Sequence, residues 1–132
     1  MRIIYSGLLY LLAPLVPLYL KKRGKKNPQY LENWHERFGW NLVNPSKKPI
    51  VWFHSVSVGE TRAMYKLVEL FNENLPEYQI LITTMTPTGR ETAKKLYPYA
   101  HIHYVPYALS FSVQQFYKTF KPQLGIILET EI

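Results

Sequence analysis

Short apolar segments alternate with amphipathic ones from residue 50 onward, and this alternation limits the fold more than any other feature of the sequence. The apolar segments are 50–54, 79–84, 101–106 and 124–129, and the helical segments between them are 59–75, 89–97 and 110–121. One helix face of 59–75 has the expected spacing of apolar residues, at Met64, Leu67, Val68, Phe71 and Leu75. Strands that are apolar throughout are typical of parallel sheets covered on both faces. Residues 50–132 are therefore predicted to form an α/β domain, a Rossmann-like parallel sheet with helices on both faces.

An uncharged run occupies residues 3–20 and is followed at once by "KKRGKK". As one helix the run would be about 27 Å long, slightly less than a hydrocarbon core of about 30 Å. A secretory signal peptide would carry its positive charge before the apolar run, not after it. Residues 1–26 are therefore predicted to be a membrane-anchor helix whose basic flank stays in the cytoplasm. Pro14 and Pro17 favour a bent or interfacial anchor, and a helix buried in the protein's own core is the alternative.

Residues 27–49 are predicted to join this anchor to the main domain. Segment 27–40 is expected to form a juxtamembrane helix that ends at Gly39. Its apolar face would hold Leu31, Trp34 and Phe38, and the aromatic side chains of Tyr30, Trp34 and Trp40 would lie at headgroup level. Segment 44–49 reads as a polar linker.

The net charge of +7 has an uneven distribution. Residues 1–50 hold nine of the 16 Lys and Arg residues but only two of the nine acidic residues, so the remaining chain is balanced. A nucleic-acid-binding domain would spread its basic residues over the folded body, so nucleic acid is not an expected partner. Anionic membrane lipids are the expected partner of the basic run. The absence of cysteine excludes disulfides and thiolate metal sites.

Polar residues gather where the predicted strands end, in "HSVSVGE", "TTMTPTGR", "PYALS" and "ETE". Ligands of such sheets bind beyond the carboxyl ends of the strands. Neither GxGxxG nor GxxxxGK[ST] occurs, so no ordinary nucleotide fingerprint is present. Glu60 lies in the first turn of a predicted helix, where a carboxylate also serves simply as a cap. Capping equally explains Thr86, Thr88 and Gly89, and His54 could be a buried, hydrogen-bonded histidine.

Three motifs in combination point to a family. "HSVSVGET", "LITTMTPTGRETA" and "IILETE", with "ERFG" at 36–39, resemble the N-terminal domain of the Kdo transferases, which add 3-deoxy-D-manno-octulosonic acid to lipid A precursors. The resemblance implies an inverting glycosyltransferase of the two-domain GT-B type on the cytoplasmic face of the cell inner membrane. It also implies an N-terminal domain that binds the lipid acceptor (lipid IVA), a C-terminal domain that binds the donor CMP-Kdo, and no cofactor or metal.

The same resemblance assigns roles to individual residues. Glu60 matches the family's general base, and Glu129 matches a glutamate credited with stabilising the transition state. The residues expected to bind the acceptor are Ser55, Ser57, Gly59, Thr86, Thr88, Gly89 and Arg90. Backbone N–H groups at a helix N-terminus, together with Arg90, would hold an acceptor phosphate. "PYALS" departs from the family's usual "PYDLP", because Ala108 stands where an aspartate is typical.

Other functions stay open. The sequence stops directly after a predicted strand, so we expect residues 50–132 to be the acceptor half of an enzyme, inactive without its donor domain. A membrane-tethered binding domain without catalysis would use Glu60 only as a cap. A GT-B glycosyltransferase acting on another lipid-linked acceptor, such as a peptidoglycan precursor, would share the same architecture.

Overall fold

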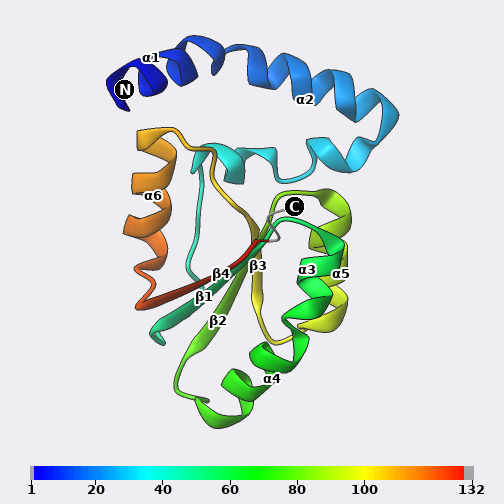
Figure 1. Cartoon of the computed structure of the whole chain (residues 1–132), viewed down its shortest axis with the longest axis vertical. Helices are drawn as coiled ribbons and strands as arrows, with labels where there is room; N and C mark the ends of the chain where they lie inside the picture. The colour runs from blue at the N-terminus through cyan, green and yellow to red at the C-terminus, as the bar shows by residue number, and fades with distance from the viewer. Residues whose placement is uncertain (1, 130–132) are drawn as a thin grey trace.

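The computed structural model describes residues 2–129, which form a four-stranded parallel sheet with helices on both of its faces (Figure 1). The sheet order is β3-β2-β1-β4. Its strands are β1 (Ile50–Ser55), β2 (Gln79–Thr84), β3 (His101–Tyr104) and β4 (Leu124–Leu128). The helices that follow them are α3 (Val58–Ala63), α4 (Tyr65–Asn74), α5 (Pro87–Leu96) and α6 (Ser110–Phe120). The predicted α/β fold with a parallel sheet is confirmed. Thr130, Glu131 and Ile132 of the predicted domain lie outside the described residues.

The strand order reverses between β1 and β4. From β1 the chain moves to β2 and then β3 on one side, and it returns through α6 to place β4 on the other side of β1. His54 of β1 is the register partner of Ile127, and Ser55 is the partner of Leu128. The loops after β1 and β4 therefore leave the sheet side by side, at the topological switch point where ligands of open α/β sheets bind.

Each face of the sheet has its own apolar core. On the face covered by α3, α4 and α5, Phe53, Ile82 and Val68 are fully buried together with Tyr97. On the face covered by α6, Leu81 packs with Phe116 and Phe120. Two covered faces explain why the strands are apolar throughout, as the sequence indicated.

The predicted helix 59–75 is two helices. It breaks at Met64, whose ψ of −2° ends α3 before α4 begins at Tyr65. Met64 and Val68 are both buried, at 1% and 0% exposure, whereas Leu67 is 38% exposed. The prediction of one continuous apolar face was therefore wrong, because the break reorients α4 so that only part of the expected stripe meets the sheet.

The predicted juxtamembrane helix 27–40 is also wrong. The segment forms two 3-10 helices, η1 (Pro28–Leu31) and η2 (Trp34–Phe38). Asn33 separates them with φ of 53°, a left-handed conformation that no continuous helix contains. Gly39 ends η2 with φ of 72°, in agreement with its predicted role as a C-cap.

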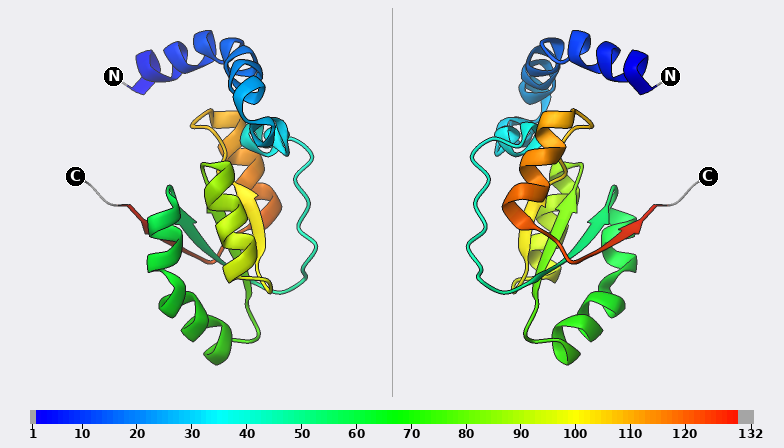
Figure 2. Two further views of the ribbon diagram at one scale, coloured as in Figure 1. Left: turned by 90° about the vertical axis from the view of Figure 1, so that its right-hand side faces the viewer. Right: turned by 90° about the vertical axis from the view of Figure 1, so that its left-hand side faces the viewer.

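The uncharged run 3–20 is divided between α1 (Arg2–Leu12) and α2 (Leu15–Lys26), which meet at 52°. This bend fits the predicted effect of Pro14 and Pro17. No single helix of residues 2–129 is long and apolar enough to cross a membrane, and only the bent pair passes a test of length and composition. Ile3, Ile4 and Leu11 are 88%, 77% and 74% exposed, so α1 is not a core helix. In Figure 2 α1 and α2 arch over the end of the sheet where the strands finish, and α1 projects to one side.

Candidate functional site

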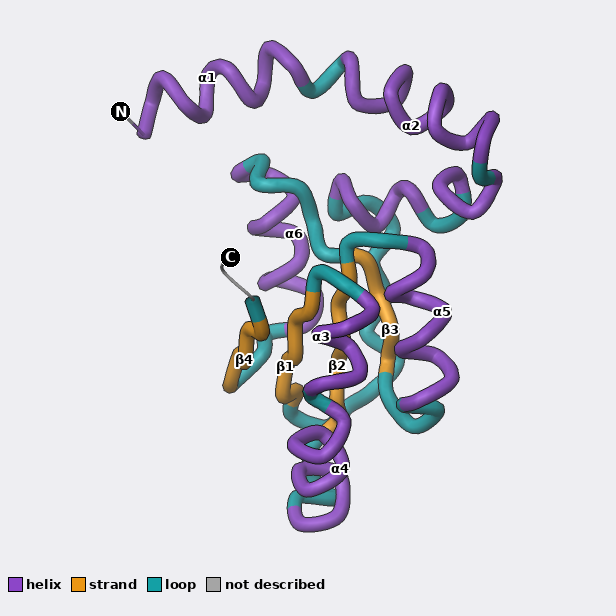
Figure 3. The backbone as a smooth tube through the Cα atoms, turned by 45° about the vertical axis from the view of Figure 1, so that its right-hand side comes forward, coloured by secondary structure: helices purple, strands orange, loops and turns teal. Residues whose placement is uncertain are grey.

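The loops at the carboxyl edge of the sheet face the pair α1–α2 (Figure 3). Ser55, Thr84 and Tyr104 end β1, β2 and β3, and Glu129 directly follows β4. This arrangement gathers the polar motifs of the sequence at one edge of the domain.

Glu60 forms a capping box at the start of α3. The Ser57 hydroxyl accepts a hydrogen bond from the Glu60 backbone N–H at 3.3 Å. In return, Oε2 of Glu60 accepts from the backbone N–H groups of Val56 and Ser57, at 2.6 and 3.1 Å. The capping function is therefore real, and it also fixes the carboxylate beside the loop that follows β1.

His54 lies near the end of β1, at the edge of the sheet that also carries Glu60 and Glu129. Its Nδ1 lies 2.8 Å from Oγ1 and 3.1 Å from the carbonyl oxygen of Thr83, and that Oγ1 accepts from Nε1 of Trp52 at 2.8 Å. Burial lowers the pKa of His54, opposed by the hydrogen bond to Thr83 and by the negative charges of Glu60 and Glu129. The two glutamates follow the neighbouring strands β1 and β4, at the same edge of the sheet as this imidazole. His54 is the buried, hydrogen-bonded histidine that the sequence allowed.

Ser55 and Ser57 differ in access. Ser55 is fully buried, and its hydroxyl lies 2.8 Å from that of Thr61, which donates to the Ser57 carbonyl at the same distance. Ser57 and Gly59 are exposed, so they can meet a ligand, whereas the Ser55 hydroxyl is engaged inside the domain.

The loop after β2 begins α5 with a second cap. Oγ1 of Thr86 accepts from the backbone N–H of Gly89 at 3.1 Å and lies 3.3 Å from Oγ1 of Thr88. A Cβ on Gly89 would lie 3.0 Å from the Thr86 hydroxyl, which explains the glycine. Thr88 is exposed and Gly89 is buried. The capping explanation for this loop is therefore real, and binding of a ligand stays a prediction.

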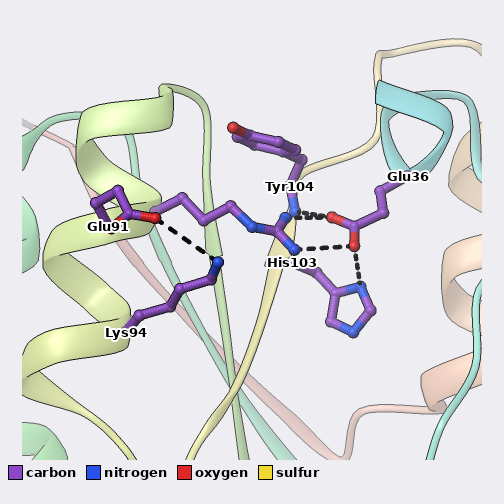
Figure 4. Close-up of polar contacts among 6 residues, drawn as sticks. Glu36, Glu91, Lys94, His103 and Tyr104 are labelled. Carbon is purple, nitrogen blue, oxygen red and sulfur yellow. Dashed lines mark hydrogen bonds and ion pairs between the residues drawn. The ribbon is translucent and has the colours of Figure 1, made fainter. Parts of the chain in front are cut away.

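Arg90 has a partner that the sequence did not indicate. Its two terminal nitrogens bind both carboxylate oxygens of Glu36, and both side chains are buried. The backbone N–H of Tyr104 donates to Glu36 at 2.9 Å, and Nδ1 of His103 lies 3.4 Å from the same carboxylate (Figure 4). Burial would raise the pKa of Glu36, but the hydrogen bond and charge of Arg90, the His103 charge and the Tyr104 N–H together lower it. Glu36 therefore already neutralises the cation that the sequence assigned to an acceptor phosphate.

A cavity of about 450 Å³ lies between α1–α2 and the strand-end loops. Its walls are mostly apolar. Leu9, Leu12, Ala13 and Val16 come from α1, α2 and the turn between them, and Met85, Val105, Pro106, Tyr107, Ala108 and Leu109 come from the loops. Arg37 and His54 complete the wall. No motif in the sequence indicated this cavity, because its walls come from segments far apart in the chain. Across residues 2–129, no group of three or more His, Cys, Asp or Glu side chains could hold a metal ion.

Comparison with known proteins identifies relatives along nearly the whole chain. A family described as 3-deoxy-D-manno-octulosonic-acid transferase (kdotransferase) matches residues 32–132. Proteins named 3-deoxy-D-manno-octulosonic acid transferase are 34% identical in Haemophilus influenzae, 32% in Chlamydia trachomatis and 31% in Bordetella pertussis. These matches cover 99%, 76% and 99% of this chain, but only 31%, 24% and 32% of the relatives, so the chain spans about a third of their length or less. No solved structure matches the chain significantly.

Proposed function

This chain belongs to the 3-deoxy-D-manno-octulosonic acid (Kdo) transferase family, and from that premise we propose that the protein transfers Kdo from CMP-Kdo to a lipid A precursor. The reaction is a step of lipopolysaccharide biosynthesis. The observation that carries the proposal is the position of Glu60 and Glu129, which follow the adjacent strands β1 and β4 at the switch point.

Glu60 is the general base of this proposal. A sugar hydroxyl is a poor nucleophile, so a carboxylate within about 3 Å takes its proton as the oxygen attacks the anomeric carbon of Kdo. The new C–O bond forms as the bond from that carbon to the phosphate of CMP breaks, with inversion at the carbon. The bond electrons leave with the phosphate, which needs no acid at this position. Two backbone N–H donors already fix the Glu60 carboxylate for this task.

Glu129 takes the second role. The Kdo ring gains positive charge as its bond to the phosphate breaks, and a carboxylate nearby stabilises that charge. Glu129 is exposed at the end of β4, on the side of β1 opposite to β2. A substrate in the crevice between these loops would therefore reach both glutamates.

In an enzyme of the GT-B type, this domain is the acceptor half, and the donor CMP-Kdo binds to a second domain. Ser57, Gly59 and Thr88 are exposed at the starts of α3 and α5, where they can contact the acceptor. No cofactor or metal takes part in the proposed reaction, whose proton transfer and charge stabilisation are performed by the two carboxylates.

We further propose that α1 and α2 hold the enzyme on the cytoplasmic face of the inner membrane. The exposed side chains of Ile3, Ile4 and Leu11 form an apolar outer surface. α2 ends in basic residues, with Arg23, Lys25 and Lys26 in its last turn. A bent helix pair with these properties lies in the interface, with cations that attract anionic headgroups.

The test is a transfer assay with the full-length protein, labelled CMP-Kdo and lipid IVA, followed by chromatography of the lipid product. The expected product is lipid IVA that carries labelled Kdo. A parallel reaction with a lipid-linked peptidoglycan precursor must remain unlabelled. Labelling of the second lipid alone would assign a different acceptor, and binding of lipid IVA without transfer would favour a non-catalytic binding domain.

A further inference from the structure

Arg37 is a buried cation at the wall of the apolar cavity. Its residue is 3% exposed, and it is the one permanently charged side chain among the described residues that line the cavity. Its backbone carbonyl accepts from the N–H of Tyr107 at 2.7 Å, which fixes η2 to the loop after β3. The backbone at Arg37 is therefore held in place before any ligand binds.

The guanidinium of Arg37 is only partly satisfied by its described neighbours, the side chains of Tyr104 and Tyr107. No carboxylate among residues 2–129 forms an ion pair with it, since the neighbouring Glu36 is bound to Arg90. Its Nε and Nη2 are buried and have no hydrogen-bond partner in that part of the chain. The rings of Tyr104 and Tyr107, whose centroids lie 3.9 and 5.9 Å from Cζ, offset only part of the charge. A buried cation with two unused donors is costly unless an anion completes it.

The unused donors indicate which anion fits. Nε and Nη2 of an arginine lie side by side and point the same way, so they bind two oxygens of one phosphate at once. The walls around Arg37 are apolar, so a free hydrated phosphate would lose its water without compensation from most of the cavity. A phosphate attached to an alkyl chain satisfies both parts of the site.

The helices α1 and α2 form the wall of the cavity that is nearest to the proposed membrane-binding surface. Leu9 and Val16 of α1 and α2 line the cavity, whereas Leu8, Leu11 and Leu18 of the same helices are exposed by 53% or more. One helix pair thus separates the cavity from the surface at which lipids would approach. The opposite wall includes His54 of β1, the strand that leads into the loop and helix carrying Glu60.

We propose that this cavity binds an acyl chain of the lipid acceptor and that Arg37, through Nε and Nη2, binds a phosphate of the same molecule. The assignment of the ligand as the acceptor depends on the proposed function. In this arrangement Arg37 binds the phosphate that was expected to bind Arg90. Arg90 is instead paired with Glu36 in a buried ion pair.

The test measures binding of dodecyl phosphate and of uncharged dodecanol to the full-length protein by calorimetry in non-ionic detergent. Arg37→Gln should weaken dodecyl phosphate binding by about tenfold or more, because charge-assisted hydrogen bonds are lost. Dodecanol binding should stay the same. The matched control is Arg62→Gln, which changes an exposed arginine of α3 and should leave both affinities unchanged. Equal affinity of Arg37→Gln and wild type for dodecyl phosphate would overturn the proposal.

A second variant tests the site in case Arg37→Gln does not fold. Leu12 is 44% exposed and lines the cavity from α1, so Leu12→Trp fills space without disturbing the sheet. It should weaken binding of dodecyl phosphate and dodecanol alike, and unchanged binding of both would contradict the site.

Competition identifies the natural source of the phosphate. Lipid IVA should displace dodecyl phosphate at a lower concentration than phosphatidylglycerol does, whereas equal displacement would overturn the assignment to the acceptor. None of these measurements requires turnover. If the full-length protein binds dodecyl phosphate as expected but transfers no Kdo, the proposed function is contradicted and the binding site at Arg37 is still supported.

Discussion

Glu36 and Arg90, 54 positions apart in sequence, form a buried two-point ion pair in which Nη2 of Arg90 lies 3.1 Å from Oε1 of Glu36. The pair joins η2, in the segment before the sheet, to α5. The Tyr104 backbone N–H donates to the same carboxylate, so the pair also holds the end of β3. It therefore fixes the segment that supplies Arg37 to the edge of the sheet where the candidate site lies.

Loss of one partner should destabilise the fold strongly. Arg90→Ala leaves the Glu36 carboxylate buried without its cation, and breaking such a pair costs about 3–5 kcal/mol. Urea unfolding followed by tryptophan fluorescence measures the change. Arg62→Ala, at an exposed position on α3, is the control and should change the free energy of unfolding by less than about 0.5 kcal/mol. If Arg90→Ala were as mild as this control, the pair would have no structural role.

The double variant Arg90→Leu, Glu36→Leu gives a separate measure of the pair. Apolar residues in place of both charges remove the burial cost of each, so the double variant should be more stable than Arg90→Ala. Unfolding of the double variant at a lower urea concentration than Arg90→Ala would show that the polar contacts themselves, including the bond from Tyr104, are needed.

The free energy of unfolding should decrease as the pH is lowered, in two separate pH ranges. Burial and the positive charge of Arg90 lower the pKa of His103 despite the opposing charge of Glu36. The unfolded chain then binds a proton first, so stability falls below about pH 6.5, by up to about 1.4 kcal/mol per pH unit for one histidine. The pKa of Glu36 is also lowered, so its contribution is complete above about pH 4.5 and is lost as the pH falls through its folded value.

Urea unfolding at a series of pH values separates the two groups. His103→Gln should flatten the decline between pH 7 and 5, whereas Glu36→Gln should flatten the decline below pH 4.5. A decline between pH 7 and 5 that is equally steep in His103→Gln would assign the first window to another group, such as His54, whose pKa burial also lowers.

Local patterns predicted the sheet well, because each strand depends on its own residues and on burial of both faces. The predicted range 79–84 coincides with β2 (Gln79–Thr84), and the clustering of polar motifs at strand ends followed from parallel topology. The break at Met64 and the left-handed Asn33 had no such signal, because tertiary packing and not helix propensity decides them. The partner of Arg90 could be identified only from the structure, because nothing in "ERFG" indicates that Glu36 lies against α5.

Gly39 should tolerate no side chain. Its φ is 72°, and a Cβ would lie 2.8 Å from the backbone oxygen of Ser112 in α6. Gly39→Ala should therefore destabilise the fold by about 1–3 kcal/mol, through strain and displacement of α6. Gly7→Ala is the control, because nothing lies within 4 Å of its Cβ position and alanine favours the helix. Thermal unfolding of both variants checks this, and equal Tm values would contradict it.

The outer surface of α1 and α2 should control membrane binding. Leu11 and Leu18 are 74% and 63% exposed, so Leu11→Glu and Leu18→Glu leave the folded body unchanged. Each should weaken binding to vesicles with anionic lipid by about tenfold or more, since burial of one leucine contributes about 1.5–3 kcal/mol. Co-sedimentation measures this, with Leu67→Glu on α4 as the control at an exposed leucine. Equal sedimentation of all variants would exclude α1 and α2 as the membrane contact.

Glu129 should affect turnover without setting the pH response. In the proposed reaction it stabilises positive charge on the Kdo ring and takes no proton, so Glu129→Gln should lower kcat and leave the acidic limb of the pH–rate profile in place. Steady-state transfer assays across pH with the full-length protein give both quantities. An unchanged kcat would exclude Glu129 from the reaction.

The capping box allows one substitution to separate the two functions of Glu60. Glutamine also fits the third position of a capping box, and its amide oxygen can still accept from Val56 and Ser57. Glu60→Gln should therefore change the free energy of unfolding by less than about 0.5 kcal/mol. It cannot take the proton of the acceptor hydroxyl, so kcat should fall by about 10²–10⁴ with little change in lipid affinity.

The pH–rate profile and a second variant complete this test. The acidic limb should disappear in Glu60→Gln, because protonation of the base causes it. Glu60→Ala removes the cap as well, so it should lower kcat to the same extent and also destabilise the fold by about 0.5–2 kcal/mol. Full activity in Glu60→Gln together with a destabilised Glu60→Ala would leave Glu60 as a cap alone. An acidic limb that persists in Glu60→Gln and vanishes in Glu129→Gln would exchange the roles of the two carboxylates, since only the group that takes the proton sets that limb.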